Sequence, residues 1–339
     1  MENLNISYSL KNIPCPSKKS YIKALISKTE NFLKRLRWKA YFFDNPKPDQ
    51  NVIQDNKYGF KTLNTPPANQ NLSNFEEDMI ELITNIKYTS TNCSFQNKMN
   101  MDCEKVKNSG NVVVEADKTH NLYLLEPKDY NKLIFENITQ SYQKCDPNEK
   151  CKIDEKSAQI AQKFKIEDRV QQFTTDECFL TIKDHKPNFP NSIKCRLINP
   201  AKNQLGKVSQ QILRKIIDNL TSKLELNMWK NTDNVIDWFT VADNANARLI
   251  KFDIVDFYPS INEELLNKAL AFAKSHVPIS EDDLQLINHT KSSLLFDGKS
   301  TWKKKSGAFD VTMGSYDGAE CCEIVGIYLL NKLSKNNAT

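Results

Sequence analysis

The chain has 339 residues, which is enough for two or three domains with cores of their own. Hydrophobic residues make up 39% and charged residues 26%, an ordinary globular composition that excludes an intrinsically disordered chain. No window approaches the roughly 20 apolar residues of a membrane span, so we expect no membrane partner. The balance of 47 basic to 42 acidic side chains gives +5, which is compatible with a nucleic-acid partner but does not require one.

The cysteine pattern indicates reduced thiols. There are nine Cys, an odd number, and none of them forms a C-x-x-C pair. This pattern is not typical of a disulfide framework, and the ligand spacing matches no usual zinc site. We therefore expect an intracellular protein, and the sequence leaves its compartment and its oligomeric state open.

Residues 1–105 are expected to form a helical N-terminal extension. Apolar residues at helical spacing predict a helix from Ser20 to about Ala40, whose other face is basic. A basic helix face is either solvated or in contact with nucleic acid, and the pattern alone does not decide. Residues 44–72, rich in Pro, Asn and Gln, predict an irregular linker. Ser73 and Glu76 have capping-box spacing and predict the start of a second helix.

Residues 106–247 have the mixed texture of an α/β region. Strands are indicated by short stretches rich in β-branched and aromatic residues, and helices by apolar residues at a spacing of three and four. The predicted strands are Val112–Val114, Leu122–Leu125, Phe179–Ile182 and Lys194–Ile198, and the predicted helices begin near Asp129 and near Gly206, the second ending near Leu224.

Residues 248–339 begin with the most informative stretch of the chain. Leu249 to Val255 favours a buried strand, which Pro259 ends, and Ser260 with Glu263 has the spacing of a capping box that opens a helix. Further along, the sequence predicts helices over 261–275, 281–295 and 319–333, a hairpin turn at Asp297-Gly298, and a glycine-containing loop over 307–318.

Two carboxylates lie at the end of this predicted strand. Asp253 and Asp256 are three residues apart where the strand gives way to a turn. An ionised carboxylate in an apolar strand is costly unless a cation or a hydrogen-bond donor meets it, and Mg²⁺ is a natural partner for such oxygen ligands. A single strand-end Asp could instead merely cap the turn that follows.

Several separated motifs occur in a definite order along the chain. They are Ala116-Asp117-Lys118 with Tyr130, Ile182-Lys183-Asp184-His185-Lys186-Pro187, Arg196-Leu197-Ile198, the Asp253 stretch, and Val311-Thr312-Met313-Gly314-Ser315. This order resembles that of reverse transcriptases, closest to the Penelope-like retroelement group. The resemblance covers roughly residues 110–330, and the order of the motifs is more specific than any single motif. One departure is that Leu, rather than the family's usual Pro, follows Arg196.

The resemblance implies a role for each matching residue. Asp253, with the Ile254 position beside it, would hold the two Mg²⁺ or Mn²⁺ ions of a complete enzyme, and Asp253 would be catalytic. Lys183 and Arg196 would grip the triphosphate of the incoming nucleotide. The remaining nucleotide-binding positions would be Asp256, Phe257, Tyr258, Met313 and Gly314, with Tyr258 excluding a 2′-hydroxyl, and Lys186 and Ser315 would contact nucleic acid.

The implied fold class is α+β. Residues 106–247 would be the fingers and 248–339 a partial palm of a right-hand polymerase, an antiparallel sheet with packed helices, preceded by the helical extension. The function implied is RNA-directed DNA polymerase activity on an RNA or DNA template-primer with deoxynucleoside triphosphates. The family's second carboxylate motif does not occur before Thr339, so we expect a truncated and inactive form.

Two alternatives remain open on the sequence. One is a non-catalytic nucleic-acid-binding remnant of such an element, which would keep the basic surface without the chemistry. The other is a fragment similar to family B DNA polymerases, which also carry an Asp, a Tyr and a Pro-Ser-Ile sequence in their first motif. The downstream helix motif of that family does not appear here.

Overall fold

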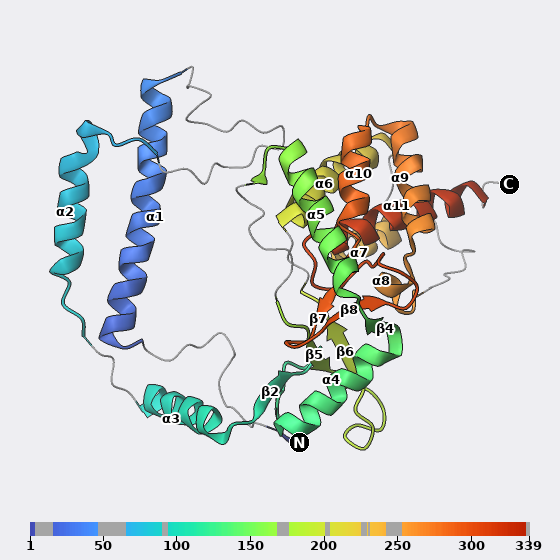
Figure 1. The fold of residues 1–339 in the computed structure, drawn as a ribbon, viewed down its shortest axis with the longest axis horizontal. Helices are drawn as coiled ribbons and strands as arrows, with labels where there is room; N and C mark the ends of the chain where they lie inside the picture. Colours follow the sequence, from blue (N-terminus) through green and yellow to red (C-terminus); the bar gives the residue numbers. More distant parts are fainter. Residues whose placement is uncertain are drawn as a thin grey trace. The chain divides into compact units, whose positions relative to one another are not determined.

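The computed structural model describes residues 1–3, 16–46, 66–89, 94–167, 176–200, 204–224, 229, 231–241 and 253–336. These residues form an α+β fold of helices and small sheets, and the sheet registers are antiparallel (Figure 1). The chain divides into two compact units, residues 1–135 with 180–196, and residues 136–179 with 197–339. Among the described helices, none is long and apolar enough to cross a bilayer.

The first unit begins with three helices. Helix α1 spans Lys18–Asp44, α2 spans Ser73–Thr84 and α3 spans Ser94–Ser109. The predicted first helix is therefore confirmed and is longer than expected. Most of the predicted linker, residues 47–65, lies outside the described residues, and the expected boundary near 105 falls within α3.

The predicted capping box at the start of α2 is wrong. Ser73 has helical backbone angles and is the first residue of the helix, preceded by the 3-10 turn Gln70–Leu72, and α2 has no side-chain cap. The carboxylate of Glu76 instead accepts two hydrogen bonds from the Arg37 guanidinium of α1. The Glu76 side chain therefore joins two helices rather than closing the end of one.

A small sheet in the strand order β1-β3-β2 forms the core of the first unit. The two predicted strands β2 (Val112–Glu115) and β3 (Leu122–Leu125) pair antiparallel, and β1 (Glu2–Asn3) pairs with β3. Strands β5 (Phe179–Ile182) and β6 (Cys195–Ile198), also predicted, form a two-stranded sheet. A buried cluster in the core of this unit consists of Val114, Ala116, Tyr123, Leu125 and Ile182.

Packed helices dominate the second unit, where α11 packs against α6 and α9, and α6 also packs against α10 (Figure 1). The sequence predicted α6, α9, α10 and α11, but it did not predict α5, α7 or strand β4. The sheet of this unit has the order β4-β8-β7, and its β7–β8 hairpin turns at Asp297-Gly298 as expected. The bounds of these elements, and of α4, which precedes them in the chain, are α4 (Pro127–Ser141), β4 (Tyr142–Lys144), α5 (Pro147–Lys163), α6 (Gln204–Leu224), α7 (Thr232–Val241), α9 (Glu263–His276), α10 (Glu281–His289), β7 (Leu295–Phe296), β8 (Thr301–Lys304) and α11 (Gly318–Asn336).

The stretch around Asp253 differs from its prediction. Residues 249–252 of the predicted strand lie outside the described residues, while Asp253 and Ile254 have no regular structure and Val255 and Asp256 form a turn. The Ile254 and Val255 side chains are 52% and 79% exposed, so this part of the stretch is not a buried strand. The short helix α8 (Phe257–Ser260) follows directly.

Two further predictions of helix ends are corrected. Helix α9 is capped by Asn262, whose side chain accepts a hydrogen bond from the Leu265 N–H, whereas Ser260 Oγ donates to the Phe257 carbonyl within α8. The capping box predicted at Ser260 therefore does not form. Helix α10 ends at His289 rather than near residue 295, because the chain turns there into the β7–β8 hairpin.

Candidate functional site

The first cluster of predicted site residues lies in the first unit around Asp117. Its Oδ1 accepts a hydrogen bond of 2.5 Å from Arg196 Nη1, and the side chains of Asp117 and Arg196 are 11% and 36% exposed. The Asp117 N–H donates to the Ile182 carbonyl at 2.8 Å, next to the parallel bridge between Ala116 and Ile182. The pieces of sequence around residues 117, 182 and 196 therefore converge.

Asp184 fixes the loop that precedes β3. Its Oδ2 accepts hydrogen bonds from Thr119 Oγ1 at 2.5 Å, Asn121 Nδ2 at 3.0 Å and the Tyr123 hydroxyl at 3.0 Å. Burial raises the pKa of the Asp184 carboxyl, but these three donors outweigh that effect and hold its pKa below the ordinary value. The Asp184 carboxylate therefore joins the end of β5 to the turn between β2 and β3.

The two predicted lysines differ in exposure. Lys183 is half-buried at the end of β5, where its N–H donates to the Lys194 carbonyl at 2.8 Å, and Lys186 is exposed in the loop that follows. Arg196 and Lys183 lie on paired strands, which keeps both cations in the same small sheet. The Asp117 carboxylate accepts a hydrogen bond from one nitrogen of the Arg196 guanidinium, which leaves the other N–H groups able to bind an anion.

The second cluster lies in the second unit around the Gly314 loop, which we define as residues 312–318. The Asn199 N–H, just after β6, donates to the Met313 carbonyl at 3.1 Å. Gly314 has a φ of 109°, and a β-carbon built there would lie only 2.8 Å from the Asn199 carbonyl oxygen. Glycine is therefore required at 314 both by the backbone angle and by the close approach of the neighbouring chain.

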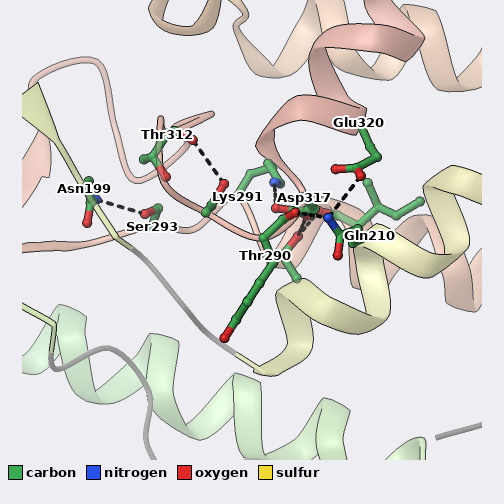
Figure 2. Close-up of polar contacts among 11 residues, drawn as sticks. Asn199, Gln210, Thr290, Lys291, Ser293, Thr312, Asp317 and Glu320 are labelled. Carbon is green, nitrogen blue, oxygen red and sulfur yellow. Dashed lines mark hydrogen bonds and ion pairs between the residues drawn. The ribbon is translucent and has the colours of Figure 1, made fainter. Parts of the chain in front are cut away.

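A buried ion pair anchors the Gly314 loop to the segment that follows α10. Lys291 Nζ donates to Asp317 Oδ1 at 2.5 Å, and both side chains are only 1% exposed. Thr290 Oγ1 donates to Asp317 Oδ2 at 2.9 Å, so both carboxylate oxygens are bonded (Figure 2). Burial lowers the pKa of Lys291, but the attraction of Asp317 outweighs it, so the ammonium stays charged.

The start of α11 is held by a second set of polar contacts. Glu320 Oε1 accepts from Gln210 Nε2 at 3.0 Å and from Arg214 Nε at 2.8 Å, and Gln210 also donates to the Tyr316 carbonyl at 2.6 Å (Figure 2). Helix α6 therefore fixes the end of the Gly314 loop, while Lys291 fixes its interior.

Helix α8 lies against the same loop. Tyr258 packs so closely on the start of α11 that a β-carbon at Gly318 would lie 3.2 Å from its Cε1 atom. Burial raises the pKa of the Tyr258 hydroxyl, helped by the nearby Cys322 and Glu320. Lys304 Nζ donates to the Pro259 carbonyl at 3.1 Å and to Asp310 Oδ1 at 2.9 Å, which fixes α8 from its other end.

The remaining predicted residues of this stretch have different surroundings. Phe257 is half-buried, whereas Asp256 is exposed with left-handed backbone angles of φ 49° and ψ 49°. Met313 and Ser315 are half-buried, and Ser315 Oγ donates to the Thr312 carbonyl at 3.1 Å. Ser315 therefore holds its own loop together in addition to any contact with nucleic acid.

The predicted metal ligands are one exposed carboxylate, Asp253, and the backbone of Ile254. Within the described ranges, no group of three or more His, Cys, Asp or Glu side chains could hold a metal ion. This donor set does not complete the octahedral shell that Mg²⁺ demands, and the further oxygens would come from water or from a bound nucleotide.

A cleft borders α8 without including its predicted site residues. It lies between the start of α9 and β8 and is lined by Pro259, Glu263, Glu264, Asn267, Lys304 and Phe309, among others. Neither Asp253, Asp256 nor Tyr258 contributes to it.

Sequence reasoning missed several residues on which this geometry depends. The sequence identifies Asp117 and Asp184 only as members of motifs, and nothing in it marks Lys291, Asp317 or Asn199. A Lys just after a helix and an Asp in a loop normally lie at the surface. The only available signal was the loop itself, because three of the chain's eight glycines lie between residues 307 and 318.

Comparison with models of protein families, with curated proteins and with solved structures finds no match to this chain.

Proposed function

We propose that this chain contains the fingers and part of the palm of a reverse transcriptase-type nucleotidyltransferase, and that it binds a deoxynucleoside triphosphate together with an RNA or DNA template-primer. The proposal rests first on the order of the motifs along the sequence. It is supported by the positions of those motifs, because distant segments meet within each of the two clusters.

One observation carries the proposal. Segments around residues 199, 258 and 314 lie against one another in the second unit, through the Asn199–Met313 hydrogen bond and the packing of Tyr258 on Gly318. A nucleotide site of this type needs an aromatic ring next to a loop whose backbone a flat base pair can approach closely. Tyr258 and the exposed Gly314 supply these two features.

The proposed binding of the triphosphate depends on Arg196 and Lys183. A guanidinium matches the oxygen spacing of a phosphate, and the Asp117 carboxylate holds the Arg196 group in a fixed orientation. In the second unit, Asp253 and the Ile254 carbonyl would be protein ligands of a Mg²⁺ ion whose other oxygens water and a nucleotide would supply, as is usual for nucleotide-bound magnesium. The metal would neutralise phosphate charge when it is bound.

The test is binding of a fluorescent dATP analogue to the full chain with and without Mg²⁺. We expect Arg196→Ala to weaken this binding about tenfold or more, because it removes a charge-assisted contact. The matched control is Lys128→Ala, an exposed cation on α4 that should leave the affinity unchanged. Equal affinity of the Arg196→Ala variant and the unaltered chain would contradict the assignment.

Sugar selectivity provides an independent readout. Tyr258→Ala should narrow the preference for dATP over ATP, because the ring no longer fills the space of a 2′-hydroxyl. Competition between the two nucleotides measures this ratio directly. A ratio that does not change would contradict the role proposed for Tyr258, even if the variant binds both nucleotides less tightly.

A further inference from the structure

Helix α1 concentrates the positive charge of the chain. Its residues Lys18–Asp44 include eight Lys or Arg and two acidic residues, giving the helix +6, whereas the whole chain carries +5. All residues outside α1 are therefore nearly balanced in charge. Such a local excess of cations is an electrostatic footprint for an anionic partner.

Helix α2 covers only one side of α1. Thr29 and Leu33 are the buried residues of α1, Arg37 pairs with Glu76 of α2, and the Phe32 and Phe75 rings lie 6.4 Å apart. At about 100° per residue, Arg35 and Phe42 lie on the opposite side of the helix from Leu33. The apolar stripe of α1 is thus already used within the protein.

The opposite side carries an aromatic cluster. The Trp38 ring lies 5.7 Å from that of Tyr41 and 5.8 Å from that of Phe42, and Phe42 is 46% exposed. The Trp38 Nε1 donor is buried and has no hydrogen-bond partner among the described residues. The three rings lie against one another within α1, with the Tyr41 and Phe42 rings also 5.8 Å apart.

Three exposed cations flank the aromatic cluster on the same side. Lys28, Arg35 and Lys39 span 12 residues, or about 16 Å along the helix axis. In the described part of the chain, none of the three forms an ion pair or a side-chain hydrogen bond. We define the outer face of α1 by Lys28, Arg35, Trp38, Lys39 and Phe42.

We propose that the outer face of α1 binds single-stranded nucleic acid. Proteins that bind single strands combine cations that follow the phosphates with aromatic rings on which bases stack, and here both kinds of side chain alternate on one face. On a membrane-surface helix, by contrast, the apolar and cationic faces are opposite each other, and the apolar face lies in the lipid. The face shares no residue with the proposed nucleotide site.

The test is fluorescence anisotropy of the full chain with a labelled 20-nucleotide oligo(dT), measured over a range of KCl concentrations. The triple variant K28A/R35A/K39A should weaken binding at least about tenfold and should lower the salt slope by about 2, since each phosphate contact contributes about 0.7. The control variant K105A/K128A/K152A removes the same charge from exposed positions outside α1 and should bind normally.

A second variant tests stacking separately from charge. W38L/F42L should weaken binding to oligo(dT) severalfold with no change in the salt slope, because it removes rings and no cation. A duplex of the same length should bind the unaltered chain less tightly, because its bases are not available for stacking. Thermal melting followed by circular dichroism checks that each variant is folded.

Three results would overturn the proposal. The first is equal loss of affinity in the control triple variant, which would indicate a nonspecific effect of charge. The second is equal or tighter binding of the duplex. The third is binding to vesicles of phosphatidylcholine with 30% phosphatidylserine that is lost in K28A/R35A/K39A while oligo(dT) binding persists. Nucleotide affinity of the α1 variants should be unchanged, so failure here leaves the nucleotide site unaffected.

Discussion

At the scale of single residues, the Gly314 loop depends on Lys291 and Asp317. Their charges are fully removed from water, and their mutual attraction, with the Thr290 hydroxyl, compensates for that cost. A buried pair of this kind adds little net stability compared with apolar residues, but it strongly penalises the loss of one partner. The pair also fixes one arrangement of the loop.

We expect Asp317→Ala to lower the free energy of unfolding by about 3–5 kcal/mol, because it leaves the Lys291 ammonium buried without a counterion. Urea denaturation measures the change. The control is Glu264→Ala, which breaks the exposed pair with Lys268 and should cause no measurable change. The double variant K291M/D317L should recover most of the loss, and a loss below 1 kcal/mol in Asp317→Ala would contradict the buried pair.

His289 makes stability depend on pH. Its Nε2 is hydrogen-bonded to Ser157 Oγ at 2.7 Å, and burial, together with the charge of Lys156, lowers its pKa to about 4. The unfolded chain binds the proton near the ordinary pKa of about 6.5, so it takes up more protons than the folded chain between these values. Stability should therefore fall as the pH decreases from about 6.5 to about 4, by on the order of 3 kcal/mol in total.

The measurement is chemical denaturation at several pH values across this window. In His289→Gln the slope between pH 6.5 and pH 4 should decrease, although the carboxylates still contribute below pH 5. An unchanged slope in that variant would show that His289 is accessible to protons in the folded state.

Gly314 and Gly307 form a matched pair. Both have positive φ angles, 109° and 129°, but a β-carbon at 314 would meet the Asn199 carbonyl at 2.8 Å, while one at 307 would meet nothing within 4 Å. Gly307→Ala should cost about 1–3 kcal/mol through the backbone angle alone, and Gly314→Ala should cost more. Equal shifts of the two melting temperatures would contradict the close approach of Asn199.

At the scale of helices and strands, local rules predicted where elements lie better than where they end. Helix α10 begins at Glu281 as predicted, where Ser280 Oγ accepts from the Asp283 N–H, but it ends early in a turn toward the β7–β8 hairpin. The capping boxes at Ser73 and Ser260 fail because a neighbouring short helix takes up the backbone just before each helix. Caps depend on the backbone angles of the preceding residues, which the pattern of residue types does not specify.

Two substitutions test which residue caps the start of α9. Asn262→Ala should lower the free energy of unfolding by about 1 kcal/mol, since the Leu265 N–H loses its acceptor. Ser260→Ala, at the position of the predicted cap, should change it by less than about 0.5 kcal/mol. A larger effect of Ser260→Ala than of Asn262→Ala would show that Ser260, and not Asn262, caps α9.

At the scale of the whole molecule, the chain crosses between its two units at residues 135, 179 and 196. The core of the first unit needs Ile182 from β5, and the turn between β2 and β3 needs Asp184. Residues 1–135 alone therefore do not complete the core of the first unit. The second unit likewise combines residues 136–179 with the end of the chain.

A fragment of residues 1–135 should therefore not form the native β2–β3 sheet. It lacks Ile182 from the core and the Asp184 acceptor of three hydrogen bonds. Hydrogen exchange of the Tyr123 and Leu125 amides in the fragment and in the full chain tests this expectation. Equal protection in the two would show that the β2–β3 hairpin is stable without β5 and β6.

The sequence by itself determined the α+β class, four of the strands and most of the helices, because apolar periodicity and turn residues act over a few residues. It also located the Gly314 loop. Only the tertiary structure decided that Asp117 pairs with Arg196, that Lys291 is buried against Asp317, and that Asp253 is exposed rather than at the end of a buried strand. These contacts join residues that are 79 and 26 positions apart, and no local pattern encodes which distant partner will remove a charge from water.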